Sequence, residues 1–127
     1  MRVLLIDDDV SVVENLALYL SRSFHTVELR SWIEGRTALI EILKNFQPQG
    51  VILDFGMSPS GTDIYDWIKS WTKEVTQPLV PIVFYTSYAN SPEYRRDMTA
   101  VGAREDQIIE KREVGLDVPV LLRALGA

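Results

Sequence analysis

Short runs of apolar residues alternate with longer amphipathic stretches along this chain. The runs at residues 3–6, 51–53 and 82–85 are continuously apolar, which is typical of strands buried on both faces of a sheet. Residues 26–30 alternate between polar and apolar side chains and predict a strand with one exposed face. The run at 107–110 is the weakest, with two apolar residues. These five runs are the predicted strands.

Each predicted strand is followed by a stretch whose apolar residues recur every three or four positions, which is the spacing of one helix face. We expect Ser11, Asp8 or Asp9 to cap the first helix. Pro119 is expected in the first turn of the last helix, where proline is tolerated. The apolar stripes are Val13, Leu16, Ala17, Leu20 and Phe24; Ala38, Leu39, Ile42, Leu43 and Phe46; Ile64, Trp67, Ile68, Trp71 and Val75; Tyr94, Met98 and Val101; and Val118, Leu121, Leu122 and Leu125.

The order of strand and helix, repeated five times, predicts an α/β fold with a parallel sheet and helices on both faces. The three wholly apolar strands fit the middle of the sheet, and those at 26–30 and 107–110 fit its edges. This arrangement matches the flavodoxin-like (βα)5 doubly wound sheet with strand order 2-1-3-4-5. Because the chain has 127 residues and no internal repeat, residues 1–127 are expected to form a single domain.

The composition excludes several kinds of chemistry. The chain has no cysteine and one histidine, which excludes a disulfide scaffold, thiol catalysis and a Cys- or His-rich metal site. Its 13 basic and 18 acidic residues give a net charge of −5, which argues against direct binding to nucleic acid or anionic lipid. No apolar run is long enough for a membrane span, and the start does not read as a signal peptide, so we expect a cytoplasmic protein.

Acidic, hydroxyl and lysine side chains follow the predicted strands at their carboxyl ends. In doubly wound folds, ligands bind at this edge of the sheet, where the strand order reverses. Here the reversal lies between the strands at 3–6 and 51–53. The residues just past the strands are Asp7, Asp8 and Asp9 after the first, Asp54 after the third, Thr86 and Ser87 after the fourth, and Lys111 after the fifth.

This set of side chains favours a metal and phosphoryl site. Crowded carboxylates repel one another unless a cation intervenes, and oxygen ligands suit Mg²⁺ or Mn²⁺. A nearby lysine and hydroxyl suit an oxyanion, and Asp54 could be the nucleophile that accepts a phosphoryl group. Taken singly, an aspartate here caps a helix or forms a turn, and a lysine is usually solvated. The convergence of four strand ends therefore carries the hypothesis.

In order and spacing, these segments resemble the receiver domain of two-component response regulators, over essentially the whole chain. The resemblance implies a metal site for Mg²⁺ (or Mn²⁺) formed by Asp7, Asp8, Asp54 and the backbone carbonyl of Gly56. Asp8 would contact the metal directly, and Asp7 would act largely through water. The matching segments are residues 3–9, 51–54, 82–87 and 101–103 together with Lys111.

The resemblance also implies a phosphorylation-controlled signalling switch. Asp54 would accept a phosphoryl group from a histidine kinase or a histidine phosphotransfer protein, while Thr86 and Lys111 would contact the phosphoryl oxygens. The protein would catalyse only its own phosphorylation and dephosphorylation. Gly56 has no side chain to shield the acyl phosphate, whereas Tyr88 could. The output would be a changed surface around the fourth helix, fifth strand and fifth helix, read by a downstream protein.

Three positions depart from the family pattern. Ser58 separates Met57 from the proline that usually follows it directly. Arg112 follows the lysine where the family usually has a proline in a cis bond, and a cis bond before arginine would cost about 2.5–4 kcal/mol, so we expect a different loop. The family's rotating aromatic residue is replaced by Ile108, or by Gln107 in a shifted register, and neither can perform an aromatic flip.

Two other functions are consistent with part of the pattern. A pseudo-receiver would bind proteins without being phosphorylated. The missing aromatic and proline residues favour it, and the retained acids, hydroxyl and lysine disfavour it. A haloacid-dehalogenase-like phosphohydrolase would use Asp7 as the nucleophile with Asp9, Thr86 and Lys111. That function lacks a further acidic motif after the lysine and leaves Asp54 without a role.

Overall fold

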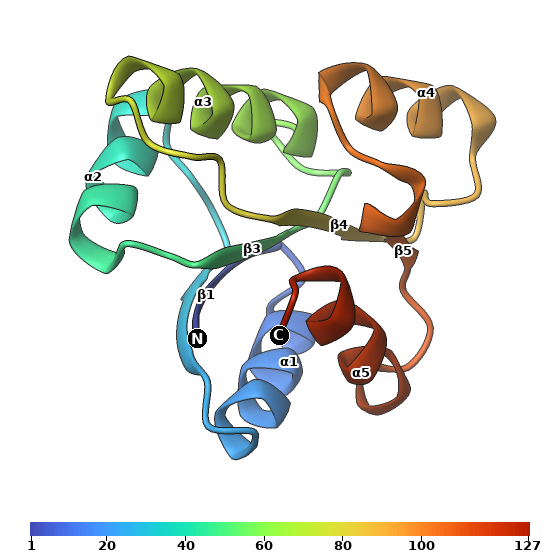
Figure 1. The fold of residues 1–127 in the computed structure, drawn as a ribbon. Coiled ribbons are helices and arrows are strands. Elements are labelled where there is room, and N and C mark those ends of the chain that lie inside the picture. Colours follow the sequence, from blue (N-terminus) through green and yellow to red (C-terminus); the bar gives the residue numbers. More distant parts are fainter.

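Five parallel strands form one sheet in the computed structural model, which describes residues 1–127 (Figure 1). A short 3-10 turn, Glu105–Gln107, precedes the last strand. The elements in chain order are β1 (Arg2–Ile6), α1 (Val10–Arg22), β2 (Thr26–Arg30), α2 (Arg36–Phe46), β3 (Gly50–Leu53), α3 (Gly61–Glu74), β4 (Ile82–Thr86), α4 (Pro92–Val101), β5 (Ile108–Glu110) and α5 (Val114–Ala124).

The strand order is β2-β1-β3-β4-β5, which confirms the predicted flavodoxin-like topology. Helices α2, α3 and α4 cover one face of the sheet, and α1 and α5 cover the other (Figure 1). The ends of β1 and β3 are in register, because Ile6 pairs with Leu53. The residues that follow these two strands therefore start from the same edge of the sheet.

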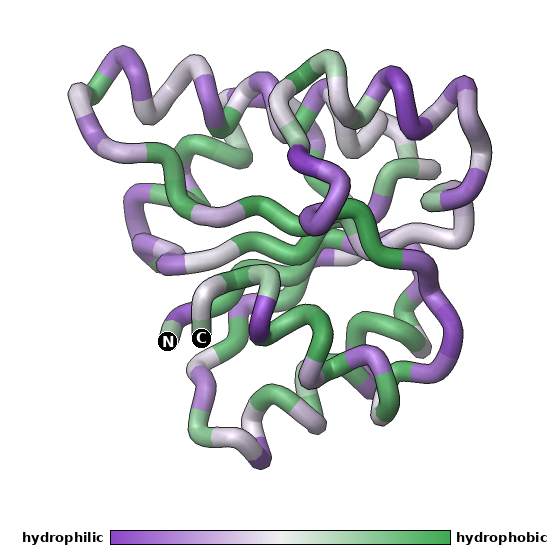
Figure 2. Tube along the Cα trace, turned by 45° about the vertical axis from the view of Figure 1, so that its right-hand side comes forward, coloured by the Kyte–Doolittle hydropathy of each residue, from purple (hydrophilic) through white to green (hydrophobic).

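The sheet separates two hydrophobic cores. Alternation along β1 sends Leu4 and Ile6 into the core beneath α2, α3 and α4, and Val3 and Leu5 into the core beneath α1 and α5. The central strands β1, β3 and β4 are buried almost throughout, whereas β2 is partly exposed, as its alternating sequence predicts. Figure 2 shows the hydrophobic residues concentrated along the central strands. This packing holds the strand ends in fixed positions.

The helix ends agree with the sequence in part. Asp9 is the N-cap of α1, where its carboxylate accepts hydrogen bonds from the Ser11 hydroxyl at 2.8 Å and the Val12 N–H at 3.4 Å. Gly102 closes α4 with φ 125°, a conformation that glycine adopts without strain. The expectation that Phe24 belongs to the apolar face of α1 is wrong: the helix ends at Arg22, and Phe24 is 95% exposed in the turn to β2.

Helix α5 begins earlier than the apolar spacing indicates. It starts at Val114, so Pro119 lies inside the helix rather than in its first turn. Proline lacks the N–H that would bond to the carbonyl of Gly115, one turn earlier. The apolar spacing does not indicate the early start, because the core-facing position one turn before Leu121 is occupied by a polar residue, Asp117, which is only 6% exposed.

None of the helices combines the length and the apolar character that crossing a membrane requires.

Candidate functional site

Two buried aspartates lie at the carboxyl edge of the sheet, one after β1 and one after β3. The Asp54 N–H donates a hydrogen bond to the Ile6 carbonyl at 2.9 Å, and the Asp7 N–H donates to the Arg30 carbonyl at 3.1 Å. These bonds continue the ladder of the sheet beyond the last strand residues. Asp7 is 6% exposed and Asp54 is 7% exposed. Their carboxylates are therefore held by the backbone of the sheet rather than by flexible loops.

Lys111 joins the two aspartates. Its Nζ lies 2.8 Å from Oδ2 of Asp7 and 3.3 Å from Oδ2 of Asp54. Its backbone N–H donates to the Thr86 carbonyl at 3.1 Å, which fixes the start of the loop after β5 against the end of β4. The Lys111 side chain is 15% exposed. A partly buried ammonium group thus compensates part of the negative charge at this edge.

Asp8 completes a group of three carboxylates. One oxygen from each of Asp7, Asp8 and Asp54 can be chosen so that all three lie within 4.8 Å of one another. Asp8 is exposed, whereas the other two are buried, so the group opens to solvent on one side. Oxygen donors in this number suit a hard divalent cation such as Mg²⁺. The donor set fits the predicted metal, and Asp8 supplies its accessible side.

The electrostatics of the site are dominated by burial and by the Lys111 pairs. Burial raises the pKa of Asp7, and the hydrogen bond from Lys111 opposes this shift. Burial alone would lower the pKa of Lys111, but its contacts with Asp7 and Asp54 outweigh that effect and raise it. Lys111 is therefore protonated at neutral pH. Asp9 differs, because the hydrogen bond from Ser11 lowers its pKa at an exposed position.

Thr86 ends β4 at the same edge of the sheet. It is fully buried, and its hydroxyl oxygen accepts a hydrogen bond from the Tyr88 N–H at 3.2 Å. Strand β4 also pairs with β5 here, Thr86 opposite Glu110. Thr86 at the end of β4 is thus next to Lys111, which directly follows β5.

An aromatic trio formed by Phe55, Tyr88 and Tyr94 lies beside the site, and the sequence did not reveal it. The ring centroids are 6.1 Å apart for Phe55 and Tyr88, and 5.1 Å apart for each of the other two pairs. A methyl group on Gly56 would overlap the Tyr88 ring. The loop after β3 is therefore packed against the loop after β4. Edge-to-face and tilted pairs of this kind add stability beyond buried area.

The structure places the predicted residues as follows. Asp7, Asp8, Asp54 and Lys111 are brought together, and Thr86 lies at the neighbouring strand end. Asp9 is set apart as a helix cap.

The two substituted family positions also have defined surroundings. Ile108 is buried and packs in the core beneath α4. The bond between Lys111 and Arg112 is not cis, since the cis peptide bond of the chain is Ser58–Pro59. This agrees with the expected difference in the loop after Lys111.

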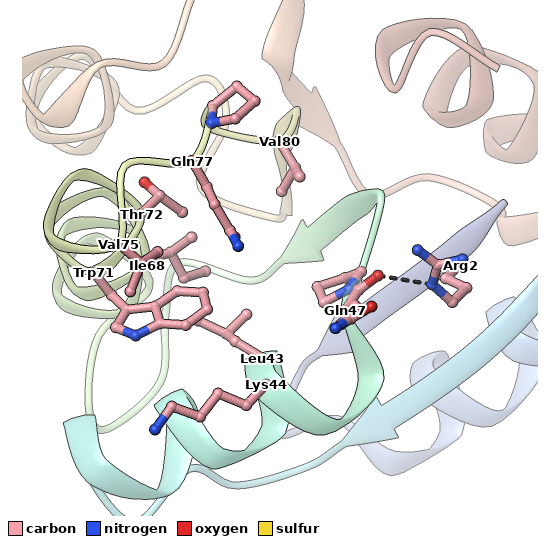
Figure 3. Close-up of a pocket in the computed structure, with 12 residues that line it drawn as sticks. Arg2, Leu43, Lys44, Gln47, Ile68, Trp71, Thr72, Val75, Gln77 and Val80 are labelled. Atoms are coloured by element: carbon pink, nitrogen blue, oxygen red, sulfur yellow. Dashed lines mark hydrogen bonds between the residues drawn. The ribbon is translucent and has the colours of Figure 1, made fainter.

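A separate hollow of about 370 Å³ lies at the opposite, amino edge of the sheet, between α2 and α3 (Figure 3). Trp71, Leu43 and Ile68 line its apolar side, and Arg2 and Lys44 lie at its border. The Arg2 Nε donates to the Gln47 carbonyl at 2.7 Å. None of the residues that line this hollow is acidic. It is therefore separate from the carboxylate group.

A comparison with protein families finds one match that covers most of the chain. The family model described as "Response regulator receiver domain" matches residues 3–115. A search of curated proteins found no match.

Solved structures of similar fold agree with this match. The chemotaxis protein CheY4 of Vibrio cholerae is 24% identical, with a TM-score of 0.76, over 98% of this chain and 98% of that chain. A CheY-like response regulator receiver domain protein from Methanospirillum hungatei JF-1 is 18% identical, with a TM-score of 0.73, over 98% and 93% of the two chains. The BeF3-activated N-terminal receiver domain of Klebsiella pneumoniae RstA is 20% identical, with a TM-score of 0.71, over 98% of each chain. At these identities the likeness establishes the fold.

Proposed function

We propose that this chain, which belongs to the response regulator receiver domain family, is a phosphorylation-controlled signalling switch that accepts a phosphoryl group on Asp54. The observation that carries the proposal is the position of Lys111, whose Nζ lies 3.3 Å from Oδ2 of Asp54 and 2.8 Å from Oδ2 of Asp7. A nucleophilic carboxylate, a second acid and a cation for the phosphoryl oxygens are thus within reach of one another.

Asp7, Asp8, Asp54 and the backbone carbonyl of Gly56 would hold Mg²⁺ or Mn²⁺. The three side chains offer oxygen atoms within 4.8 Å of one another. When bound, the metal neutralises charge on the phosphoryl oxygens. Asp8 is exposed and Asp7 is buried, which fits Asp8 as the direct ligand and Asp7 as a ligand acting through water.

The carboxylate of Asp54 is oriented by its own chain. Its Oδ1 accepts a hydrogen bond from the Phe55 N–H at 2.8 Å. In the transfer, an Asp54 oxygen would form a bond to phosphorus while the bond between phosphorus and the donor's imidazole nitrogen breaks, and the imidazole leaves with its electron pair and takes up a proton. Lys111 would then pair with the phosphoryl oxygens instead of with the Asp54 carboxylate. The catalysis is limited to the protein's own phosphorylation and dephosphorylation.

The donor would be a histidine kinase or a histidine phosphotransfer protein, and residues 1–127 would act in the cytoplasm as one receiver domain. The Thr86 hydroxyl, which now accepts from the Tyr88 N–H, would donate to the phosphoryl group. That contact would draw Thr86 toward the site. The movement of Thr86 would then shift the aromatic trio, because the Tyr88 N–H is bonded to the Thr86 hydroxyl. The surface of α4, β5 and α5 would then present the changed state to a downstream protein.

Intact-mass measurement tests this function directly. The protein is incubated with Mg²⁺ and acetyl phosphate, and one phosphoryl adduct is expected that is lost in Asp54→Asn. Asp9→Asn is the matched control, because Asp9 is also acidic and lies beside the site but serves as a helix cap. Absence of an adduct with any donor would favour a pseudo-receiver. An adduct that survives Asp54→Asn and is lost in Asp7→Asn would favour a hydrolase.

A further inference from the structure

A buried tyrosine and a buried aspartate form a hydrogen-bonded pair beneath the site, on the α1 and α5 side of the sheet. Tyr85 of β4 is 2% exposed, and Asp117 in the first turns of α5 is 6% exposed. The Tyr85 hydroxyl donates to Oδ2 of Asp117 at 2.7 Å. The backbone N–H of Arg112 donates to the same oxygen at 2.9 Å. One carboxylate oxygen thus joins β4, α5 and the loop that follows β5.

An aspartate is an unusual residue for this position. Val118 and Leu121 of α5 pack in the same core as Tyr85, and an apolar residue at position 117 would extend that surface. No lysine or arginine forms an ion pair with Asp117. A buried carboxylate without a cation is costly unless its oxygens accept hydrogen bonds. Oδ2 of Asp117 accepts two hydrogen bonds, which meets that requirement for this oxygen.

The pair acts on the residue next to Lys111. The Lys111 N–H is held by the Thr86 carbonyl at 3.1 Å, and the following N–H, from Arg112, is held by Asp117. Both peptide units that flank the Lys111 Cα are therefore fixed. In addition, Lys111 Nζ lies 6.0 Å from the centroid of the Tyr85 ring, which lies beneath the lysine side chain.

The hydroxyl of Tyr85 is a dependable donor in this arrangement. Burial and the hydrogen bond to Asp117 raise the pKa of Tyr85 far above its ordinary value. The hydroxyl therefore stays protonated over the whole physiological range. Burial of both side chains also excludes water that would compete for the carboxylate oxygen.

We propose that Tyr85 and Asp117 are positioning residues that fix the peptide after Lys111 and so hold its ammonium group between Asp7 and Asp54. The phosphorylation readout of this inference rests on the proposed function. The inference itself concerns where the lysine lies and can be tested without phosphoryl transfer.

The first test measures the rate of phosphorylation by acetyl phosphate at saturating Mg²⁺. Asp117→Leu keeps the branched shape of the side chain but removes the acceptor, and we expect the rate to fall about tenfold or more, since small misplacements of a reacting group have effects of this size or larger. Asp117→Asn retains an acceptor oxygen and should restore most of the rate. Leu121→Ala is the matched control, because Leu121 is fully buried in the same helix and forms no part of the pair.

A double substitution separates positioning from general loss of structure. In a Lys111→Ala background, Asp117→Leu should cause no further fall in rate, because the group it positions is gone. Equal falls in the presence and absence of Lys111, or a similar fall in Leu121→Ala, would overturn the proposal. If Asp117→Leu does not fold, Tyr85→Phe provides the same test, since it removes one of the two donors with little change of volume.

The second test is independent of the proposed function. The acylation rate of Lys111 is compared with that of exposed Lys73 in the same molecule, using a small amine-reactive ester and mass spectrometry. We expect Asp117→Leu to increase the relative labelling of Lys111 several-fold and Asp117→Asn to leave it near the wild-type value. If the wild type is never phosphorylated, the proposed function fails. The labelling of Lys111 relative to Lys73 then tests the positioning role by itself. An unchanged ratio in both Asp117→Leu and Tyr85→Phe overturns the positioning role.

Discussion

Replacing Lys111 with methionine removes the ammonium group that lies between the carboxylates of Asp7 and Asp54. Methionine preserves much of the length and volume of the side chain, so the change is mainly one of charge. In the wild type the two N–O distances are 2.8 and 3.3 Å, and the lysine and the two acids are all largely buried. In Lys111→Met the two buried carboxylates face each other without a cation, and the exposed Asp8 adds a third negative charge.

The size of the effect follows from this geometry. With an effective dielectric constant of about 20, unit charges at these two distances attract by about 5–6 kcal/mol each, but the cost of burying the ions offsets most of that energy. Breaking a buried pair by removing one partner typically costs about 3–5 kcal/mol. For Lys111→Met we expect the free energy of unfolding to fall by about 3 kcal/mol, the lower end of this range, because the acids lie at an edge of the sheet that opens to solvent. For a domain of this size, that corresponds to a fall in Tm of about 12 °C.

Thermal unfolding followed by tryptophan fluorescence measures this effect, with and without Mg²⁺. We expect the metal to stabilise Lys111→Met more than the wild type, because it relieves the repulsion among three carboxylates. A cation at 100 times its Kd adds about 2.7 kcal/mol and would recover most of the loss. Lys73→Met, on the exposed side of α3, makes the same change in net charge. It should neither lower the Tm by a comparable amount nor increase the stabilisation by Mg²⁺. If Lys111→Met melts within about 2 °C of the wild type in the absence of Mg²⁺, a shift that corresponds to under about 1 kcal/mol, the reasoning is wrong.

Three further predictions concern pH and two glycines near the site. The pKa of Lys111 is raised above 10.5 in the folded state, so its contribution to stability is complete below pH 10.5 and is lost as the pH rises through the folded-state pKa; denaturant titrations should show a smaller alkaline loss in Lys111→Met than in the wild type. Gly61→Ala should destabilise the fold by about 2 kcal/mol or more, because the added methyl group would overlap the Asp54 carbonyl and the Phe55 backbone; an unchanged denaturation midpoint would contradict this. Gly56→Ala should cost much less, because the added group meets the movable Tyr88 ring, but it should shift the ring resonances of Tyr88 in NMR spectra, and unshifted resonances would show that the ring does not lie against Gly56.

Hydrophobic patterning was sufficient to predict the sheet and the edge at which the site lies. The continuous apolar runs that end at Ile6 and Leu53 are the buried central strands, and their pairing puts Asp7 and Asp54 side by side. The prediction works because burial on both faces leaves no polar position within such a strand. Lys111 follows from the same logic, since a parallel sheet brings every carboxyl end to one edge.

Contacts between loops could not be predicted in this way. The aromatic trio depends on how the loops after β3 and β4 pack together, and their sequences show no periodicity. The apolar spacing puts Tyr94 on one face of the fourth helix and indicates no contact with Tyr88, although their ring centroids lie 5.1 Å apart. The reason for a glycine at position 56 is also not apparent from the sequence. A side chain there would overlap the Tyr88 ring, and only the structure shows where that ring lies.

Helix α5 shows a different reason for failure, because a polar residue occupies a core position. The apolar stripe of the last helix begins at Val118 and has no apolar member at position 117. Without that position, the spacing predicts a helix that starts beside Pro119. The gap is filled by a carboxylate whose hydrogen bonds come from the Tyr85 hydroxyl and the Arg112 N–H. Proline at position 112 would have no N–H to donate. The arginine after the lysine and the buried aspartate in α5 are therefore two parts of one arrangement, and each explains the other's departure from its expected pattern.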